Sequence, residues 1–487
     1  MATKPSVAVI GAGLGGLCAA IKLKQAGFDD LVILERAQKV GGTWRENTYP
    51  GCACDTPVAM YQFSFAPTLS WSHLFPRAAE VQRYTEHLVD AFGLRPHLEL
   101  DCATTAAVWD ETRARWRLTT GQGRVIDVDA VVCALGQLNR PLLPEIPGRA
   151  QFAGPAFHSA QWQHDVDLRG KRVGVIGSAA SAVQLIPEVA AVAGQLTVFQ
   201  RTPNWLLPRL DREITDEDKA LLMTAPHVAS LAREQIYQAA DYLFWQVFSW
   251  TREGRAAYTR QALMHLEAQV PDPALRARLT PDYPIGCKRV LFADDYYPAL
   301  LRPHVTLVTS PITGMTATGV ETADGGDHPL DVVVYATGFE TTGWHWSIDV
   351  VGREGVHLRD QWADAPAAYL GITTTQCPNF FMVYGPNTNL GHNTITFMIE
   401  RQVEYAVQAL ETMHAKGWSS IEVTRAAQER FNQDLQAALA NTTWADPGCQ
   451  SWYKRPDGRI TQNWSSHTRD YAAATATVQW ADYQTRP

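Results

Sequence analysis

Two glycine-rich turns, each followed at the same distance by a charged residue, are the segments of this sequence best suited to hold a dinucleotide. The first is GAGLGG at residues 11–16, which follows an apolar run at residues 6–10 and opens an apolar helical stretch. It satisfies the pattern G-x-G-x-x-G with Gly11, Gly13 and Gly16. Such glycines let the backbone turn tightly, so that a pyrophosphate can lie against the N–H groups of a helix N-terminus. This context predicts a dinucleotide site rather than a purely structural turn.

The second turn, GSAASA at residues 177–182, repeats the strand–turn–helix context but departs from the glycine pattern. Alanine stands at the second and third glycine positions, and the Cβ of Ala179 narrows the approach of a pyrophosphate. The residues predicted to contact a cofactor here are Gly177, Ser178 and Ser181. A turn that only packs a helix against a strand, without a ligand, is the alternative.

The charged residues that follow the two turns differ in sign. Glu35 lies 24 residues beyond Gly11, and Arg201 lies 24 residues beyond Gly177. A carboxylate accepts hydrogen bonds from ribose hydroxyls and repels a 2′-phosphate, whereas an arginine does the reverse. We therefore expect FAD at the first turn and NADPH at the second. Ordinary surface charge at both positions is the alternative, and the matched spacing disfavours it.

A repeated closing strand supports two nucleotide-binding units. The segment DAVVCALG at residues 129–136 recurs as DVVVYATG at residues 331–338. These repeats predict an α/β fold with two Rossmann-like dinucleotide-binding domains, one for FAD and one for NADP. We expect the first part of the FAD-binding domain at 1–140, the NADP-binding domain at 141–335 with a helical insertion at about 211–280, and the second part of the FAD-binding domain at 336–487.

The composition is that of a globular protein and disfavours several other classes. With 487 residues, of which 46% are apolar and 19% charged, the chain has ample material for large cores. The net charge of −8 argues against a surface for nucleic acid or an acidic membrane. Eight scattered cysteines without a CxxC pair disfavour a structural zinc site and a disulfide framework. From this spacing we expect no bound metal. Because neither a signal peptide nor a membrane-spanning run is recognisable, we also expect a cytoplasmic protein.

Three further segments are longer and more specific than the glycine turns. GGTWRENTYPGCACD at residues 41–55 fits (A/G)-G-x-W-x4-(F/Y)-P-(G/M)-x3-D, and FAGPAFHSAQW at residues 152–162 fits F-x-G-x3-H-x3-W. The third segment is GCKR at residues 286–289. On these segments the chain resembles, over nearly its whole length, the type I Baeyer–Villiger monooxygenases, which are class B flavoprotein monooxygenases. Trp162 favours this branch over simple flavin-containing monooxygenases, which carry tyrosine there, although Gln163 replaces the family's usual proline or aspartate.

The resemblance implies roles for individual residues. In this family the lysine of the third segment contacts the 2′-phosphate of NADP, and the arginine lies beside the flavin. Lys288 and Arg289 are therefore implied in these roles, and Trp464 is implied in a mobile C-terminal loop that folds over NADP. The residues implied to contact FAD are Thr43, Trp44, Asp55 and Tyr61, and the turn at Arg201 and Thr202 resembles one that contacts NADP.

The chemistry of the implied reaction favours Arg289 and Asp55 as the catalytic pair. Reduced flavin adds O₂ at its C4a atom, and the resulting peroxide must stay anionic to attack a ketone carbonyl. A fixed guanidinium stabilises that anion and the oxyanion that follows. Asp55 would orient the arginine and compensate its buried charge. An ordinary N-cap for Asp55 and a surface cation for Arg289 are the alternatives.

We therefore expect an enzyme that uses NADPH and O₂ to insert one oxygen beside a ketone carbonyl, through a C4a-peroxyflavin, and so forms an ester or a lactone. Oxygenation of sulfur or nitrogen is the close alternative. A flavin-dependent NADPH oxidase or disulfide reductase is more distant, because the CxC spacing of Cys52 and Cys54 is too short for the dithiol of that class.

The expected partners are a small-molecule ketone and O₂, and the sequence discloses neither the particular ketone nor the oligomeric state. Aromatic residues near 245–250, together with Trp344 and Trp346, suit either a bulky or aryl substrate or ordinary core packing. For His158 we expect a positional role rather than general-acid catalysis.

Overall fold

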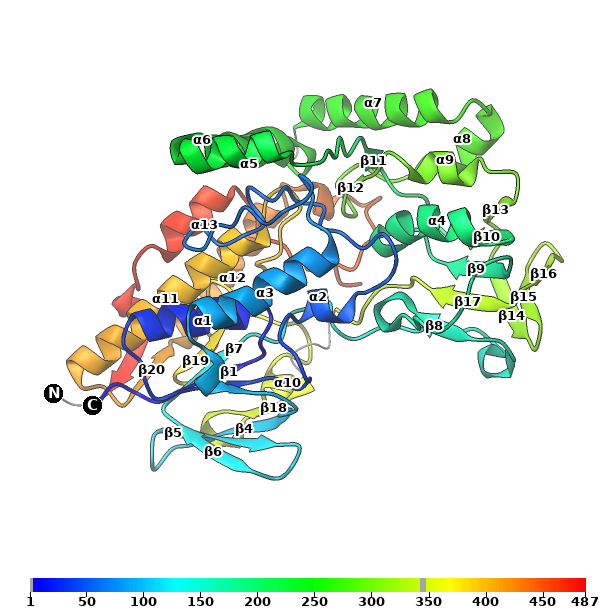
Figure 1. Cartoon of the computed structure of the whole chain (residues 1–487). Coiled ribbons are helices and arrows are strands. Elements are labelled where there is room, and N and C mark those ends of the chain that lie inside the picture. Colours follow the sequence, from blue (N-terminus) through cyan, green and yellow to red (C-terminus); the bar gives the residue numbers. More distant parts are fainter. Residues whose placement is uncertain (1–2, 250, 342–346) are drawn as a thin grey trace.

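A computed structural model describes residues 3–249, 251–341 and 347–487, and two parallel five-stranded sheets organise this part of the chain. Their strand orders are β19-β7-β1-β2-β3 and β13-β10-β9-β17-β8. Figure 1 shows the two sheets in separate α/β units, with green helices crossing above them. The predicted α/β fold with two Rossmann-like units is confirmed.

The first unit is built on strands that are apolar on both faces. Its strands are β1 (Val7–Ile10), β2 (Leu31–Leu34), β3 (Leu98–Glu99), β7 (Ala130–Cys133) and β19 (Phe380–Met382). Every residue of β1, β7 and β19 is buried, as expected for a parallel sheet covered on both sides. Helix α1 (Leu14–Gln25) covers one face and packs against the long α11 (Ile395–Lys416). The chain returns to this sheet through β19, after the strands of the second unit.

The second unit repeats this arrangement. Its strands are β8 (Ala156–His158), β9 (Arg172–Ile176), β10 (Gln195–Phe199), β13 (Val305–Val308) and β17 (Val332–Tyr335). The two predicted closing strands occupy equivalent places, because β7 pairs in parallel with β1 and β17 pairs in parallel with β9. Helix α4 (Ala180–Val192) packs against α9 (Tyr296–Leu300). A small antiparallel sheet of β14 (Ile312–Thr316), β15 (Gly319–Thr322) and β16 (Asp327–Pro329) lies beside this unit.

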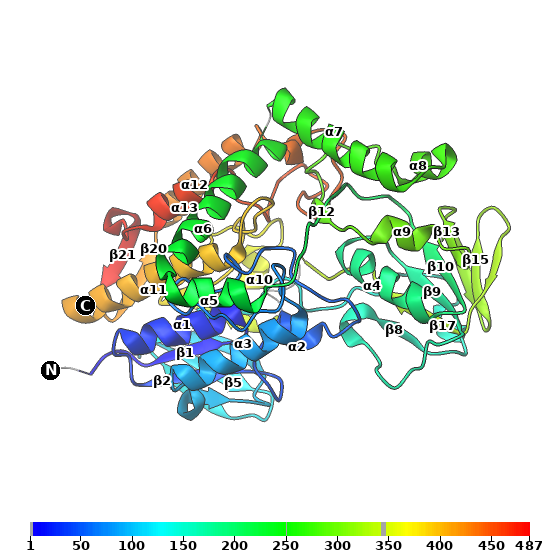
Figure 2. The same ribbon diagram turned by 45° about the horizontal axis from the view of Figure 1, so that its top comes forward.

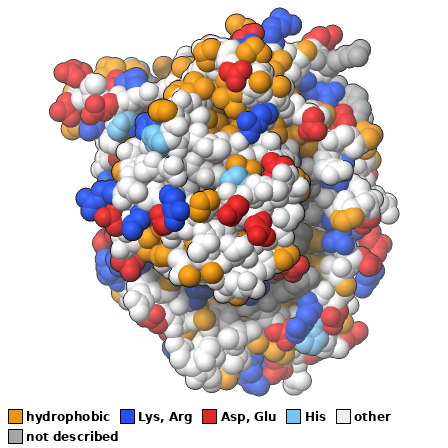
Figure 3. Space-filling model, turned by 90° about the vertical axis from the view of Figure 1, so that its right-hand side faces the viewer, with side chains coloured by type: hydrophobic (Ala, Val, Ile, Leu, Met, Phe, Trp, Pro, Cys, Tyr) orange, Lys and Arg blue, Asp and Glu red, His pale blue; other side chains and the backbone are white. Residues whose placement is uncertain are grey.

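The predicted helical insertion between β10 and β13 is present. It comprises α5 (Asp216–Thr224), α6 (Pro226–Gln238), η4 (Ala239–Leu243), η5 (Phe244–Val247), α7 (Arg252–Gln269) and α8 (Pro273–Leu279), with the short strands β11 (Leu206–Leu207) and β12 (Leu291–Phe292) at its base. Figure 2 shows these helices spanning from the first unit to the second. Figure 3, which faces the second unit, shows acidic and basic side chains interspersed and apolar side chains gathered near the top.

The C-terminal region packs against α11 of the first unit and against the helical insertion. It contains α12 (Arg425–Leu439), α13 (Thr468–Thr475) and the hairpin of β20 (Ser420–Val423) with β21 (Tyr483–Arg486). One apolar cluster joins Trp245 and Phe248 of the insertion to Trp444, Tyr453 and Trp464 of this region. The insertion therefore shares a core with the end of the chain.

The remaining elements complete the first unit. They are α2 (Thr43–Glu46), α3 (Ala78–Ala91), α10 (Leu358–Gln361) and a four-stranded sheet of β4 (Thr104–Asp110), β5 (Arg115–Thr120), β6 (Val125–Val128) and β18 (Asp349–Val351). Among the described residues, no group of three or more histidine, cysteine or acidic side chains could hold a metal ion. Within the same ranges, no helix is long and apolar enough to span a membrane.

Candidate active site

Arg289 and Asp55, which lie 234 residues apart in the sequence, form an ion pair with two hydrogen bonds. Nε of Arg289 donates to Oδ2 of Asp55 at 2.6 Å, and Nη2 donates to Oδ1 at 2.7 Å. Asp55 comes from the long loop between α2 and α3, and Arg289 from the loop that precedes β12. The side chain of Arg289 is 38% exposed and that of Asp55 is 24% exposed. The pair is thus fixed in orientation and still accessible, and neither an N-cap nor an unpaired surface cation describes it.

Each member of the pair holds the other in its charged form. Burial alone would raise the pKa of the Asp55 carboxyl, but the charge and hydrogen bonds of Arg289 lower it below its ordinary value. The charge of Asp55 raises the pKa of the Arg289 guanidinium above its ordinary value, against the opposing effect of burial. A permanently charged, oriented guanidinium can stabilise negative charge that develops during a reaction.

Aromatic hydroxyls surround this pair. Nε1 of Trp44 donates to the hydroxyl of Tyr61 at 3.0 Å, and their rings meet edge to face with centroids 5.5 Å apart. Burial raises the pKa of the Tyr61 hydroxyl, and the nearby Asp55 carboxylate adds to this effect. Burial also raises the pKa of Tyr384 and of Tyr453, and in both cases the Arg289 charge opposes the increase. The structure therefore brings Trp44 and Tyr61, predicted as FAD contacts, to the same place as Asp55.

The first glycine turn has the geometry that a pyrophosphate requires. Gly11 has a φ of +99°, and a Cβ there would lie 2.6 Å from the carbonyl oxygen of Ala134. A Cβ on Gly16 would lie 1.7 Å from the carbonyl oxygen of Gly11. Helix α1 begins after Gly13 with no side-chain cap and no acidic residue in its first turn. Its first N–H groups are thus available to an anion.

Glu35 is positioned beside this turn as a hydrogen-bond acceptor. It is buried at the end of β2, where Oε2 accepts from the N–H of Ala12 at 2.8 Å. Oε1 accepts from the N–H of Ala37 and from Nη1 of Arg45, both at 3.0 Å. These contacts fix the carboxylate where it can accept further bonds from a ribose.

The segment that carries Thr43 packs directly on the first turn. The N–H of Gly41 donates to the carbonyl oxygen of Ala12 at 2.9 Å, and a Cβ on Gly42 would lie 3.1 Å from the Cα of Gly13. The short helix α2, which begins at Thr43, therefore starts beside the N-terminus of α1. The two helix N-termini, Glu35 and the Trp44–Tyr61 pair together fit an elongated dinucleotide such as FAD.

The second turn is tied to the strand exit that carries Arg201. Gly177 has a φ of +119°, and a Cβ there would lie 2.2 Å from the carbonyl oxygen of Ala336. Oγ of Ser178 donates to the carbonyl oxygen of Thr202 at 3.0 Å. Helix α4, with Ser181 in its first turn, has no side-chain cap and no acidic residue there. This N-terminus also suits an anion, so the turn can still bind a pyrophosphate although two of its three glycines are replaced by alanine.

Arg201 and Lys288 lie near each other without a carboxylate partner. Burial lowers the pKa of Lys288, and repulsion from the Arg201 guanidinium lowers it further. Nζ of Lys288 lies 4.5 Å from the centre of the Tyr283 ring. Among the described residues, neither cation makes an ion pair with an acidic side chain. Two such cations beside the second turn fit a phosphate dianion.

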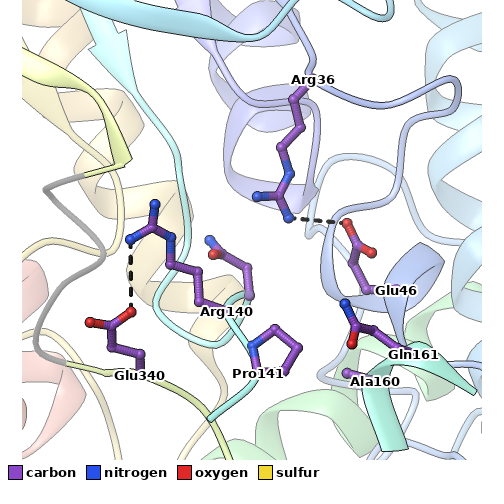
Figure 4. Close-up of a pocket in the computed structure, with 8 residues that line it drawn as sticks. Arg36, Glu46, Arg140, Pro141, Ala160, Gln161 and Glu340 are labelled. Atoms are coloured by element: carbon purple, nitrogen blue, oxygen red, sulfur yellow. Dashed lines mark hydrogen bonds and ion pairs between the residues drawn. The ribbon is translucent and has the colours of Figure 1, made fainter. Parts of the chain in front are cut away.

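A cavity of about 390 Å³ joins the two units, and its walls come from segments that follow the carboxyl ends of their strands. Figure 4 shows Arg36 and Glu46 on one side and Arg140 and Glu340 on the other. The two ion pairs measure 3.2 Å and 3.7 Å. This edge of parallel sheets is where ligands bind in open α/β folds, and Arg36 directly follows Glu35.

Comparison with known proteins identifies the family. The family described as pyridine nucleotide-disulphide oxidoreductase matches residues 5–239. A Baeyer–Villiger monooxygenase of Streptomyces coelicolor is 41% identical over 481 residues, which cover 98% of this chain and 92% of that protein. The chain belongs to the Baeyer–Villiger monooxygenases. The predicted family and enzyme class are thus confirmed.

Solved structures of Baeyer–Villiger monooxygenases have the same fold. OTEMO in complex with FAD and NADP is 30% identical, with a TM-score of 0.89 and coverage of 100% of both chains. Cyclohexanone monooxygenase from Rhodococcus sp. Phi1, bound to NADP⁺, is 29% identical, also with a TM-score of 0.89 and full coverage of both chains. The two-unit fold is therefore that of the family.

Other residues singled out in the sequence of this Baeyer–Villiger monooxygenase lie away from the Arg289–Asp55 pair or outside the described residues. Trp464 is buried in the C-terminal region, where its Nε1 donates to the carbonyl oxygen of His467 at 3.1 Å, and its contact with NADP stays a prediction. Nδ1 of His158 accepts from the N–H of Ala160 at 3.1 Å, which agrees with a positional role. Trp250, Trp344 and Trp346 lie outside the described residues.

The cysteines correct one expectation and support another. Cys52 and Cys54 are unpaired and buried, and burial raises the pKa of the Cys52 thiol to about 11. Such thiols are poor redox nucleophiles, which argues against a disulfide reductase. Cys287, however, forms a disulfide with Cys449. The scattered spacing did not predict this bond, because only the tertiary structure brings partners 162 residues apart together.

Sequence reasoning also missed Tyr384 and Tyr453. Neither lies in a motif of the site. Tyr384 follows β19 of the first unit and Tyr453 comes from the C-terminal region, and the charge of Arg289 acts on both. The hydroxyl of Tyr384 donates to Oδ1 of Asn389 at 2.6 Å.

Proposed function

We propose that this Baeyer–Villiger monooxygenase uses NADPH and O₂ to insert one oxygen atom beside the carbonyl of a small-molecule ketone, and so forms an ester or a lactone. The observation that carries the proposal is the bidentate Arg289–Asp55 pair, which places an oriented, permanent cation beside Trp44 and Tyr61. The close relatives are monooxygenases of this class, so oxygenation of sulfur or nitrogen is not favoured.

The residues present fit both cofactors. When bound, FAD supplies the redox and oxygen chemistry of the reaction, with NADPH as the hydride donor. The turn of Gly11, Gly13 and Gly16 would hold the pyrophosphate of FAD at the N-terminus of α1, and Glu35 would accept bonds from the ribose. Further contacts to FAD are proposed for Thr43, Trp44, Asp55 and Tyr61.

NADPH would bind at the second turn. Gly177, Ser178 and Ser181 lie at the N-terminus of α4, where backbone N–H groups suit the pyrophosphate. Arg201 and Lys288 would hold the 2′-phosphate, and Thr202 is fixed beside them by Ser178. Contact between Trp464 and NADP is part of the proposal. The cofactor domains are proposed at 1–140 with 336–487 for FAD, and 141–335 for NADP, with the helical insertion at about 211–280.

Arg289 would act on the substrate. As the ketone carbonyl carbon is attacked, negative charge develops on its oxygen, and a fixed guanidinium stabilises it without prior reorganisation. Asp55 keeps the plane of the guanidinium constant and balances its charge. Lysine would be a weaker substitute, because its single ammonium cannot pair with the carboxylate through two parallel bonds.

The direct test is product analysis under ¹⁸O₂. FAD-loaded enzyme would be given NADPH and a panel of cyclic, linear and aryl ketones, and products would be identified by mass. We expect at least one ketone to yield an ester or lactone that carries a single ¹⁸O atom. Consumption of NADPH with release of hydrogen peroxide and no labelled ester from any ketone would contradict the proposal.

A further inference from the structure

Asp241 is a fully buried carboxylate between the helical insertion and the C-terminal region, and the proposed function gives it no role. It lies in η4, and its side chain is 0% exposed. Oδ1 accepts from both the N–H and the Oγ1 of Thr468, each at 2.7 Å. His392 Nε2 lies 3.3 Å from Oδ1, and His467 Nδ1 lies 3.6 Å from Oδ2. In the described part of the chain, no lysine or arginine pairs with it.

Hydrogen bonds from neighbouring segments keep the Asp241 carboxylate in its charged form. Burial alone would raise the pKa of the Asp241 carboxyl, but hydrogen bonds from His392 and Thr468 lower it below its ordinary value. Burial lowers the pKa of His392, against the opposing effect of Asp241, so this imidazole is neutral near neutral pH. Asp241 also lies at the N-terminus of α13, where the helix dipole favours an anion.

The segment that Asp241 holds leads directly to the Arg289 site. We call residues 460–468 the C-terminal wall. Oδ1 of Asn463 in this wall accepts from Nδ2 of Asn389 at 2.6 Å, and Oδ1 of Asn389 accepts from the hydroxyl of Tyr384 at 2.6 Å. Tyr384 in turn is close enough to Arg289 for its charge to act on the phenol. One end of the wall therefore borders the reacting centre.

The other end of the C-terminal wall depends on Asp241. Nδ1 of His467 lies 2.6 Å from the carbonyl oxygen of Asp241, and the carbonyl oxygen of His467 accepts from Nε1 of Trp464. The N–H of Trp464 donates to the carbonyl oxygen of Asn389 at 3.0 Å. The wall is thus held at Asn389 and at Asp241. The hydroxyl of Thr468 also bonds Tyr237 and Asn393, at 2.9 Å and 3.1 Å, so loss of the Asp241 contact would loosen this end of the wall rather than release it.

We propose that Asp241 is a positioning residue for oxygen insertion, which holds the C-terminal wall against the Arg289 site and so keeps water from the reacting centre. This inference rests on the proposed function. Without the contact, NADPH, a proton and O₂ would be converted to NADP⁺ and hydrogen peroxide, and the ketone would leave unchanged. Hydride consumption at saturating NADPH would continue, because the second glycine turn and the Arg201–Lys288 pair lie outside the wall, and only the proposed contact of Trp464 with NADP lies within it.

The test measures how closely NADPH consumption is coupled to ester formation in FAD-loaded Asp241→Asn and Thr468→Val enzymes. Asp241→Asn removes the charge, and Thr468→Val removes the hydroxyl that donates to it at 2.7 Å. We expect the ratio of hydrogen peroxide to ester to rise about tenfold in each, because small misplacements near reacting atoms cost this much or more. The rate of NADPH oxidation should change less than about twofold. The matched control is Asp218→Asn, a partly exposed acid of the same insertion that caps α5 and pairs with Arg212 at 2.6 Å.

The outcomes separate the two levels of the proposal. Asp241→Asn and Thr468→Val enzymes that remain as tightly coupled as wild type would overturn the role of Asp241. Where Asp241→Asn fails to fold with FAD, the Thr468→Val enzyme alone decides in the same way. A wild-type enzyme that forms no ester from any ketone would overturn the proposed function, and this inference with it.

Discussion

The site contains two centres of positive charge that are built in opposite ways. At the first, Arg289 is locked to Asp55 by two hydrogen bonds. At the second, Arg201 and Lys288 repel each other, and no carboxylate of the described residues pairs with them. A cation that stabilises a short-lived charge needs a fixed orientation before the reaction, whereas cations that bind a phosphate gain most when the ligand is their first partner.

This difference also separates the effects of mutation. Removing a carboxylate from the first centre should affect the reaction and leave cofactor choice unchanged. Removing a cation from the second should affect the choice between NADPH and NADH and leave the reaction unchanged.

Apart from loss of Arg289 itself, Asp55→Ala is expected to have the largest effect. It leaves Arg289 without its partner, so the guanidinium loses both its orientation and its charge compensation. We expect the turnover number for ester formation to fall about 10²–10³-fold in FAD-loaded enzyme, as for loss of a preorganised electrostatic contact. The KM for NADPH should stay within about threefold. Steady-state kinetics with ester quantified by mass would check both, and an equal change in the two constants would contradict the separation.

Arg201→Ala should produce the next largest effect. A charge-assisted contact to phosphate contributes about 1.5–3 kcal/mol, which corresponds to roughly 10–100-fold in the KM for NADPH. The KM for NADH, which lacks the 2′-phosphate, should be unaffected. Parallel titrations with the two nucleotides provide the measurement. The same increase for both would show that Arg201 does not read the phosphate.

These assignments also show how much of the site the sequence could predict. The glycine turns, Glu35, Arg201 and the motif that ends at Asp55 were found because local spacing determines a strand–turn–helix unit. The partnership of Asp55 with Arg289 depended on a resemblance, since no local pattern spans 234 residues. Tyr384 and Asp241 could not have been found from local spacing, because only the tertiary structure brings Tyr384 near Arg289 and Asp241 against Thr468.

Titration of Lys288 should give the KM for NADPH a pH dependence that is smaller than these effects. Burial and the Arg201 charge lower the pKa of its ammonium, so the cation is lost at a lower pH than for an ordinary lysine. The KM for NADPH should therefore rise as pH increases through this lowered pKa, by about tenfold at most. In Arg201→Ala the repulsion is gone, and the rise should move to higher pH. Profiles of the KM for NADPH against pH in both enzymes test this, with NADH as the control.

A profile that does not move in Arg201→Ala would mean that the two cations act independently. A rise in the KM for NADH over the same pH range would mean that another group titrates.

The disulfide next to these centres should matter for stability more than for chemistry. Cys287 precedes Lys288 and Arg289 and binds Cys449 of the C-terminal region. A crosslink that closes a long loop contributes about 2–5 kcal/mol to stability. We expect Cys449→Ser to lower the midpoint of urea unfolding, while ester turnover at 25 °C changes less than about twofold. Dithiol reductant should lower the wild-type midpoint and leave that of Cys449→Ser unchanged.

The overall fold was more predictable than the site. The strand at residues 31–34 begins and ends where its apolar run does, because a buried parallel strand needs apolar residues on both faces. Trp464 shows the limit of a resemblance. Its indole packs against Tyr471 with ring centres 5.0 Å apart, a contact that depends on α13 rather than on the motif.

The most direct test of the central claim is Arg289→Ala in FAD-loaded enzyme, with NADPH oxidation, hydrogen peroxide and ¹⁸O-labelled ester measured in the same reaction. If the guanidinium stabilises oxygen insertion, NADPH should still be oxidised, nearly all of it should appear as peroxide, and labelled ester should fall at least about 10³-fold. Full ester formation with only a raised KM for NADPH would contradict the account, because Arg289 would then belong with Arg201 and Lys288 rather than with the reaction.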